Sequence, residues 1–108
     1  MNAPLASMET AFKALGDETR LRILGLLISG EVCVCHIHES LRISQSKASR
    51  HLAYLRRAGL VETRRQGVWI YYRLAESRDP VRRALVTALG RVETVRRDVD
   101  RLRKTCGC

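Results

Sequence analysis

The sequence predicts a mainly α-helical domain with one β-hairpin, and three observations support this prediction. Apolar residues recur at helical spacing through most of the first 58 positions and again after position 79. Between these stretches, a segment rich in β-branched and aromatic residues alternates with a period of two. The length of 108 residues suits a single domain over 1–108.

Two amphipathic helices are expected first. Over residues 7–15, apolar side chains have helical spacing, and Gly16 ends that helix. Asp17 can cap the next helix, which we expect over 18–29 before Gly30. The apolar stripe of this second helix consists of Leu21, Leu24 and Ile28, widened by Ile23 and Leu27.

A short helix and a longer one follow, separated by a tight turn. Val34, Ile37 and Leu41 share one face of the short helix. Ser44 is typical of an N-cap, so the longer helix is expected over 45–58, with Gly59 at its C′ position. Its inner face carries Ala48, Leu52 and Leu55.

Residues 60–74 are expected to form the β-hairpin. Val61 and Thr63 alternate with charged residues, and period two continues through 68–74. The segment 65–67, Arg-Gln-Gly, is typical of a turn. Two short helices joined by a tight turn and followed by a hairpin form a winged helix-turn-helix, which is the fold that we predict.

A last helix is expected over 79–103, with Asp79 as its cap and Pro80 at its first position. Its apolar residues are spaced four and three apart, which is a heptad seam suited to a partner helix. We therefore predict a homodimer formed through terminal helices, and a cysteine-containing tail over 104–108. The predicted interface residues are Val81, Leu85, Ala88, Val92, Val95 and Val99.

Charge and side-chain chemistry indicate double-stranded DNA as the partner. The net charge of +9 and a pI near 10.3 favour a polyanion. The fourth helix has a small, polar and basic outer face that suits insertion into the major groove, and the hairpin tip is basic. His51 lies on the inner side, where a partly buried packing or phosphate-contacting role is expected. The predicted DNA-binding residues are Ser44, Gln45, Ser46, Lys47, Ser49, Arg50, His51, Arg64, Arg65 and Gln66.

Other classes of protein are disfavoured. The sequence has neither an apolar run long enough for a membrane span nor a secretory signal, so we expect a cytoplasmic protein without a membrane partner. It has no nucleophile–base–acid constellation and no phosphate-binding loop, so neither an enzyme nor an organic cofactor is expected.

The stretch EVCVCHIHES, residues 31–40, carries two cysteines and two histidines. In a helix, side chains at i and i+2 diverge by about 200°, whereas in an extended chain they share a face. Cys33 and Cys35 can therefore hold one ion only if the first helical turn is extended or distorted. Ion binding would then deform the short helix, which supports the fourth helix, the recognition helix that we expect to enter the major groove. We also expect the helix start to lower the thiol pKa values.

The chain resembles the arsenic-responsive branch of the ArsR/SmtB metalloregulatory repressors over roughly residues 8–75. The segments EVCVCHI, QSKASRHLAYLRRAGLV and RQGVWIYYRL carry this resemblance most specifically. It implies a homodimer that binds an inverted-repeat operator and represses an arsenic-resistance operon. It also implies release from DNA when As(III) or Sb(III), the inducer, binds cysteine thiolates.

One position departs from the family pattern. The best-known relatives have a third cysteine three residues after the second, and here that residue is His38. Trivalent arsenic prefers sulfur, so the third thiolate is expected from the tail, where Gly107 lets the chain fold back. The predicted metal ligands are Cys33, Cys35, Cys106 and Cys108. Which tail cysteine, or His38, completes the site, and from which subunit, stays open.

Several alternative functions remain at this stage. The thiols could sense zinc, cadmium, lead, a methylated arsenical or oxidation, and zinc would accept two thiolates with a histidine. The zinc-sensing branch uses carboxylates and histidines of the last helix, which here has Asp98 and Asp100 but no histidine. Some cadmium and lead sensors add N-terminal cysteines, which residues 1–32 lack. A non-transcriptional thiol metal carrier would need neither the recognition helix nor the basic wing.

Overall fold

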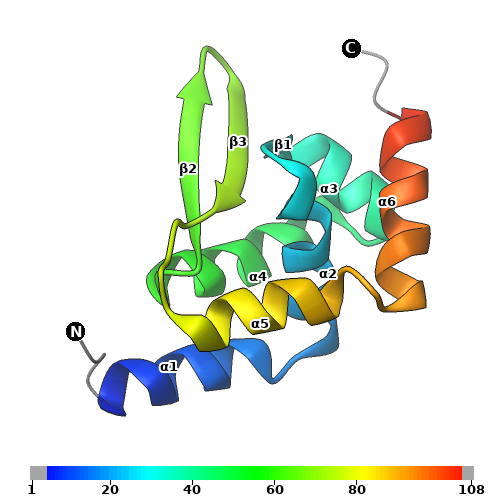
Figure 1. Cartoon of the computed structure of the whole chain (residues 1–108). Helices are drawn as coiled ribbons and strands as arrows, with labels where there is room; N and C mark the ends of the chain where they lie inside the picture. The colour runs from blue at the N-terminus through cyan, green and yellow to red at the C-terminus, as the bar shows by residue number, and fades with distance from the viewer. Residues whose placement is uncertain (1–4, 106–108) are drawn as a thin grey trace.

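The structure is a computed structural model that describes residues 5–105 (Figure 1). Six α-helices, a short 3₁₀-helix and three strands make up this part of the chain. Their bounds are α1 Leu5–Leu15, α2 Glu18–Leu26, η1 Leu27–Ser29, β1 Val32–Cys33, α3 Val34–Leu41, α4 Gln45–Arg57, β2 Val61–Gln66, β3 Trp69–Leu74, α5 Pro80–Leu89 and α6 Glu93–Thr105. The order and type of elements confirm the predicted winged helix-turn-helix.

The helix caps predicted from sequence are present. Asp17 Oδ1 accepts a hydrogen bond from the Arg20 amide at 3.1 Å, and Ser44 Oγ accepts one from the Lys47 amide at 3.1 Å. Asp79 Oδ1 accepts from the Val81 amide at 3.0 Å. Each cap satisfies an amide that has no partner within its own helix, which fixes where α2, α4 and α5 begin.

The turn between α3 and α4 passes through Arg42, which has a left-handed φ of 59°. At the other end of α4, Gly59 has a φ of 76°. The Leu60 amide donates to the Leu55 carbonyl at 3.0 Å, and the Gly59 amide donates to the Arg56 carbonyl at 3.0 Å. This pair of hydrogen bonds is the predicted Schellman ending.

The core lies between α2, α3 and α4. Its fully buried side chains include Ile23, Leu26, Ile37, Leu52 and Leu55. The inner face predicted for the fourth helix is therefore correct, and burial of this face turns the opposite, polar face of α4 outward. No helix within residues 5–105 is long and apolar enough to cross a membrane.

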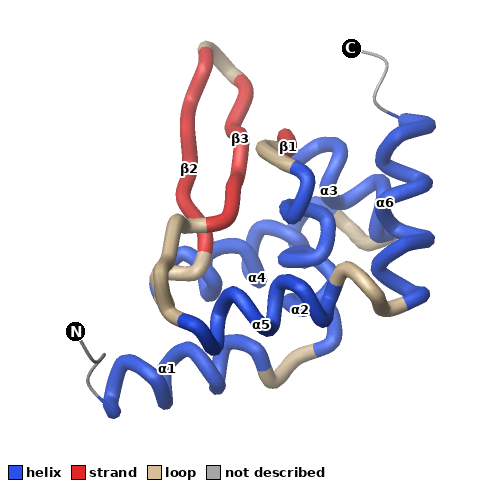
Figure 2. The backbone as a smooth tube through the Cα atoms, viewed as in Figure 1, coloured by secondary structure: helices blue, strands red, loops and turns tan. Residues whose placement is uncertain are grey.

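The three strands form an antiparallel sheet in the order β1-β3-β2. The hairpin of β2 and β3 projects beyond the helical body (Figure 2). Gln66 pairs with Trp69, so Gly67 and Val68 form the turn, and Gly67 supplies a positive φ of 62°. Strand β1 was not predicted, because two residues are too short for a period-two pattern.

The single terminal helix predicted over 79–103 is wrong, because α5 and α6 are separate helices that run in different directions (Figure 1). Gly90, a weak helix former, lies at the end of α5. Beyond it, α6 packs against α2 and α3, where Val95 lies directly over Gly25. Packing within the chain thus outweighs the continuity of the heptad pattern.

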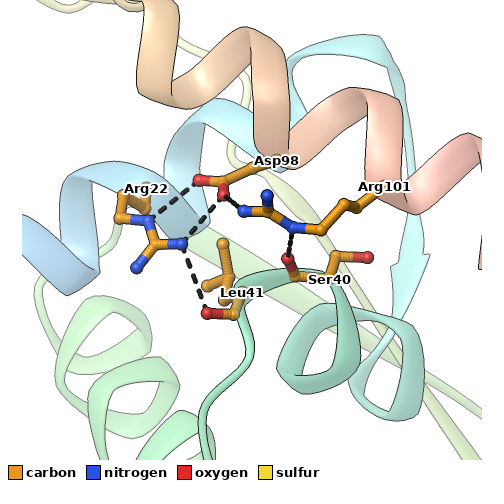
Figure 3. Close-up of polar contacts among 5 residues, drawn as sticks. All are labelled: Arg22, Ser40, Leu41, Asp98 and Arg101. Carbon is orange, nitrogen blue, oxygen red and sulfur yellow. Dashed lines mark hydrogen bonds and ion pairs between the residues drawn. The ribbon is translucent and has the colours of Figure 1, made fainter.

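A buried carboxylate fastens α6 to the rest of the domain (Figure 3). The Asp98 side chain is 0% exposed and accepts from Arg22 Nε at 2.9 Å and Arg22 Nη2 at 2.8 Å. It also accepts from Arg101 Nη2. The two arginines donate in turn to the carbonyls of Leu41, at 3.2 Å, and Ser40, at 2.7 Å. One carboxylate therefore links α2 and α6 to the last residues of α3.

Candidate nucleic-acid interface and thiol pair

The first turn of α4 carries the exposed polar residues that the sequence singled out. Gln45, Ser46 and Lys47 are exposed, and Ser49 and Arg50 continue the same polar surface. Ser44 is also exposed, but its hydroxyl is already used to cap the helix. The amides at this helix end and the neighbouring basic side chains make a surface that suits phosphate and base edges.

His51 is held against α2. Its side chain is 19% exposed, and Nδ1 lies 3.4 Å from Arg20 Nη1 and 3.9 Å from Asp17 Oδ1. Burial raises the pKa of Asp17, but the Arg20 amide and the charges of His51 and Arg20 outweigh it, so that this pKa is lowered. The predicted partly buried position of His51 is confirmed, and its imidazole braces α4 on α2.

The wing residues Arg64, Arg65 and Gln66 are all exposed. Arg64 is nevertheless engaged: its Nη2 donates to Glu31 Oε1 at 2.6 Å and its Nε to Glu31 Oε2 at 3.0 Å. Arg64 Nη1 also donates to Gln66 Oε1 at 2.9 Å. The hydrogen bond from Arg64 lowers the pKa of the Glu31 carboxyl. Sequence reasoning missed this partner, because Glu31 precedes Arg64 by 33 positions.

A row of paired residues crosses the sheet from the thiols to the wing. Cys33 of β1 is paired with Tyr71 of β3, and Tyr71 is paired with Arg64 of β2. The guanidinium of Arg64 lies 4.7 Å from the centre of the Tyr71 ring. Directly paired residues on neighbouring strands project to the same face. The segment before α3 is therefore physically connected to the hairpin.

The two front cysteines lie at a change of backbone conformation. Cys33 ends β1 and is the N-cap of α3, with an extended φ of −70° and ψ of 144°, while Cys35 lies in the first helical turn. Cys33 is buried, Cys35 is half-buried, and both are free thiols. The backbone is thus extended at Cys33 and helical from Val34 onward.

The thiol pKa of Cys35 shifts in the direction opposite to our prediction. Burial raises this pKa, and the hydrogen bond that Cys35 shares with the Cys33 thiol raises it further. A neighbouring thiol and a half-buried position favour the protonated form more than the helix start favours the thiolate.

A groove of about 660 Å³ opens beside the thiol pair. It is bounded by the start of α3, by the face of β3 and by α6. The lining includes Cys33, Cys35, His36, Trp69, Tyr71 and Leu102. Within residues 5–105, no three histidine, cysteine or acidic side chains are arranged to hold a metal ion. The predicted tail ligands Cys106 and Cys108 lie outside the described residues.

Two other candidate metal ligands point elsewhere. His38 Nδ1 lies 3.3 Å from the Ile43 carbonyl, near the C-terminal end of α3, and His38 is outside the lining of the groove beside the thiols. Asp98, the carboxylate noted for a zinc site on the last helix, is already bound by two arginines. Both contacts argue against His38 and Asp98 as metal ligands in this structure.

An apolar face joins α1 and α5. Leu5, Phe12 and Val81 are large exposed apolar residues here, at 81%, 53% and 45% exposure. A groove of about 560 Å³ between the two helices is lined in part by Phe12, Leu85 and Ala88. Of the predicted seam, Val81, Leu85 and Ala88 lie on this face, and Val92 is exposed. Val95 is 3% exposed in the subunit's own core, so its assignment to the interface is wrong.

Comparisons with known proteins find similarity to bacterial transcriptional regulators. A family model described as "Bacterial regulatory protein, arsR family" matches residues 17–63. The arsenic resistance transcriptional regulator ArsR1 of Pseudomonas putida is 53% identical over 64 residues, 58% of this chain and 50% of the relative. The arsenical resistance operon repressor of Escherichia coli is 55% identical over 65 residues, 59% of this chain and 56% of the relative.

The matched segment spans about half the length of these curated relatives. Among solved structures, the homodimeric winged helix-turn-helix DNA-binding domain of Mb0332 from Mycobacterium bovis is 37% identical. The similarity covers 78% of this chain and 76% of that one, with a TM-score of 0.69.

Proposed function

The chain belongs to the ArsR family of bacterial regulatory proteins, and we propose that it is a homodimeric repressor of an arsenic-resistance operon. In this proposal it works in the cytoplasm and leaves its operator when As(III) or Sb(III) binds cysteine thiolates. The observation that carries the proposal is the position of Cys33 and Cys35, which meet at the β1–α3 junction directly before the helix-turn-helix. Relatives named for arsenic resistance support the choice of ligand.

Operator binding would use the polar face of α4. The first turn of α4 would enter the major groove, while Arg65 and the hairpin tip would follow the backbone or the minor groove. The net charge of +9 supports a polyanion partner. DNA affinity should then fall steeply with salt, with a log-log slope of about −0.9 for each phosphate neutralised.

The proposed dimer joins subunits through α1 and α5. Exposed Leu5, Phe12 and Val81 give this face the apolar character that is typical of homodimer interfaces. Two subunits related by a twofold axis would place two α4 helices on successive turns of one face of the DNA, which predicts an inverted-repeat operator.

Three thiolates would bind trivalent arsenic in this proposal. Cys33 and Cys35 supply two, and we assign the third to Cys106 or Cys108. Leu102 of α6 lines the same groove as the two front thiols. The tail cysteines follow α6 in the chain, and they could come from the same subunit or from the partner.

Thiolate binding would act on DNA through two connected elements. Closing Cys33 and Cys35 onto one atom would reshape the first turn of α3, which packs on α4. It would also pull on β1, whose partner Tyr71 contacts the wing residue Arg64. A ligand that prefers the reshaped turn lowers DNA affinity by the difference of its affinities for the two states.

The test is fluorescence anisotropy of the reduced protein on the DNA upstream of its own gene, titrated with arsenite. We expect release from the wild type, and unchanged DNA binding without release in Cys33→Ala/Cys35→Ala. His38→Ala is the matched control, because its ring faces Ile43, and it should respond as the wild type does. Release that persists in the double cysteine variant would overturn the proposal.

Thiol oxidation is the second candidate, because Cys33 and Cys35 are both free thiols that lie two positions apart and line the same groove. A disulfide between them would also distort the start of α3. Release by a mild thiol oxidant that dithiothreitol reverses, together with indifference to arsenite, would favour this reading over the first.

A further inference from the structure

We propose that the groove beside the thiol pair is a binding site for the organic substituent of a monosubstituted trivalent arsenical. Arsenic would bond to Cys33 and Cys35, and an apolar group on arsenic would lie against Trp69 and Tyr71. This inference deepens the proposed function and rests on it for its regulatory consequence.

The chemistry matches the ligands that the groove presents. An arsenical of the form R–As(OH)₂ reacts with two thiols, so that two As–S bonds form and two As–O bonds break. The thiol protons leave with the hydroxyl groups as two water molecules. The As–C bond is kept and arsenic stays trivalent, so no oxidant or reductant is needed. Two thiols thus suffice, and two thiols are what the described residues place at this groove.

The groove has far more room than an arsenic atom needs. Its volume is about 660 Å³, and apolar side chains from three elements line it. Trp69 and Tyr71 are two apart on β3 and share a face, and Leu102 adds to the wall from α6. Cys33 is paired directly with Tyr71, so a group on its sulfur would start beside that ring. Aromatic side chains pack well against an aromatic substituent.

Charge does not oppose an uncharged ligand here. Glu31, which also lines the groove, is bound by the Arg64 guanidinium at 2.6 Å. The product R–As(S-Cys)₂ carries no net charge, so it would leave that ion pair intact. An apolar substituent gains stability in proportion to the area that it removes from water. A phenyl group should therefore bind about tenfold more tightly than a methyl group.

The experiment uses the Cys106→Ser/Cys108→Ser variant, in which two thiols remain. Its probes are phenylarsonous acid, methylarsonous acid and arsenite, measured by calorimetry. The protein has a single tryptophan, Trp69, whose fluorescence reports occupation of the groove directly. We expect the phenyl compound to bind about tenfold more tightly than the methyl compound and to change Trp69 emission more strongly. Arsenite should bind more weakly than to the wild type.

Two further variants separate the groove from general effects. Trp69→Ala in the same background should bring the phenyl-to-methyl ratio close to one, whereas Trp69→Phe should retain the preference. Val68→Ala is the matched control, since Val68 is 86% exposed at the adjoining turn and outside the groove lining. Equal affinities for the phenyl and methyl compounds, or a preference unaffected by Trp69→Ala, would overturn the inference.

Binding and DNA release are scored separately. A preference for the phenyl compound with no release of DNA by any arsenical would support the groove and contradict the proposed function. Release by arsenite from the wild type, with no phenyl preference in the tail variant, would support the function and contradict the groove.

Discussion

The two ends of α3 are held in different ways. At its C-terminus, the carbonyls of Ser40 and Leu41 are bound by arginines that share the fully buried Asp98 (Figure 3). At its N-terminus, Cys33 occupies the N-cap position without a side-chain hydrogen bond to the helix, and a groove lies beside it. The end next to the recognition helix is held by a buried ion pair, whereas the end that carries the thiols is joined to the sheet through the pairing of Cys33 with Tyr71.

This difference indicates a division of roles within one short helix. A ligand reshapes most easily a segment whose local unfolding costs little free energy. The first turn of α3, which has no side-chain cap and lies beside a groove, is such a segment. The fastened end keeps the turn into α4 fixed while the first turn changes. Four substitutions or measurements can break or sharpen this comparison.

The largest effect is expected from Asp98→Ala. It leaves Arg22 and Arg101 without their shared partner, and losing one partner of a buried ion pair costs about 3–5 kcal/mol of unfolding free energy. Urea unfolding measures the loss. Asp100→Ala, an exposed acidic residue of the same helix, should stay within about 0.5 kcal/mol of the wild type. Equal effects of the two variants would remove the distinction between the ends.

The next effect is expected from Gly25→Ala, which tests the contact of α2 with α6. A Cβ here would lie 2.5 Å from Val95 Cγ1, and overpacking of this kind costs about 1–3 kcal/mol. The better helix propensity of alanine returns up to about 1 kcal/mol. Thermal unfolding should show a net loss that Val95→Ala relieves in the double variant. Gly90→Ala, with its nearest neighbour atom at 3.6 Å, should not destabilise.

A smaller effect is expected at the other end, as a difference between two substitutions of Cys33. Serine is a preferred N-cap residue and alanine is not, so Cys33→Ser should be more stable than Cys33→Ala by about 1 kcal/mol. The serine hydroxyl would accept a hydrogen bond from an amide of the first turn, which the Cys33 side chain does not do. Urea unfolding of both variants measures this difference in unfolding free energy. A serine variant no more stable than the alanine variant would mean that this end is already held.

The smallest effect concerns the thiol of Cys35. Its raised pKa keeps the thiol protonated at neutral pH, so alkylation by iodoacetamide should be slower than for an ordinary cysteine and should accelerate only at higher pH. By linkage, the associated stability is present below the ordinary thiol pKa and is lost as pH rises through the raised value. Cys33→Ala removes one cause of the shift and should increase the rate. Peptide-level mass spectrometry measures the rate at Cys35 alone.

The features that were predictable from sequence are those encoded by neighbouring residues. The caps at Asp17, Ser44 and Asp79, the Gly59 ending and the hairpin all depend on side chains within a few positions of their partners. The polar face of α4 could be predicted because it lies opposite the apolar face of the same helix.

What sequence reasoning missed depends on distant partners. Arg22 and Asp98 are 76 positions apart, and no local pattern pairs them. The break between α5 and α6 follows from the contact of Val95 with Gly25 across the core. The upward shift in the pKa of Cys35 needs the burial and the neighbouring thiol, which a helix-start argument leaves out.

The break after α5 has a consequence for how repression would depend on protein concentration. Because α6 turns inward and completes the subunit's own core, the dimer face that we propose consists of α1 and α5. Dilution would then separate two folded subunits without melting either one. Below the dimer dissociation constant, the urea midpoint should accordingly be independent of protein concentration. The cell could set the threshold of repression through the amount of regulator it makes, with no loss of folded protein at the low end.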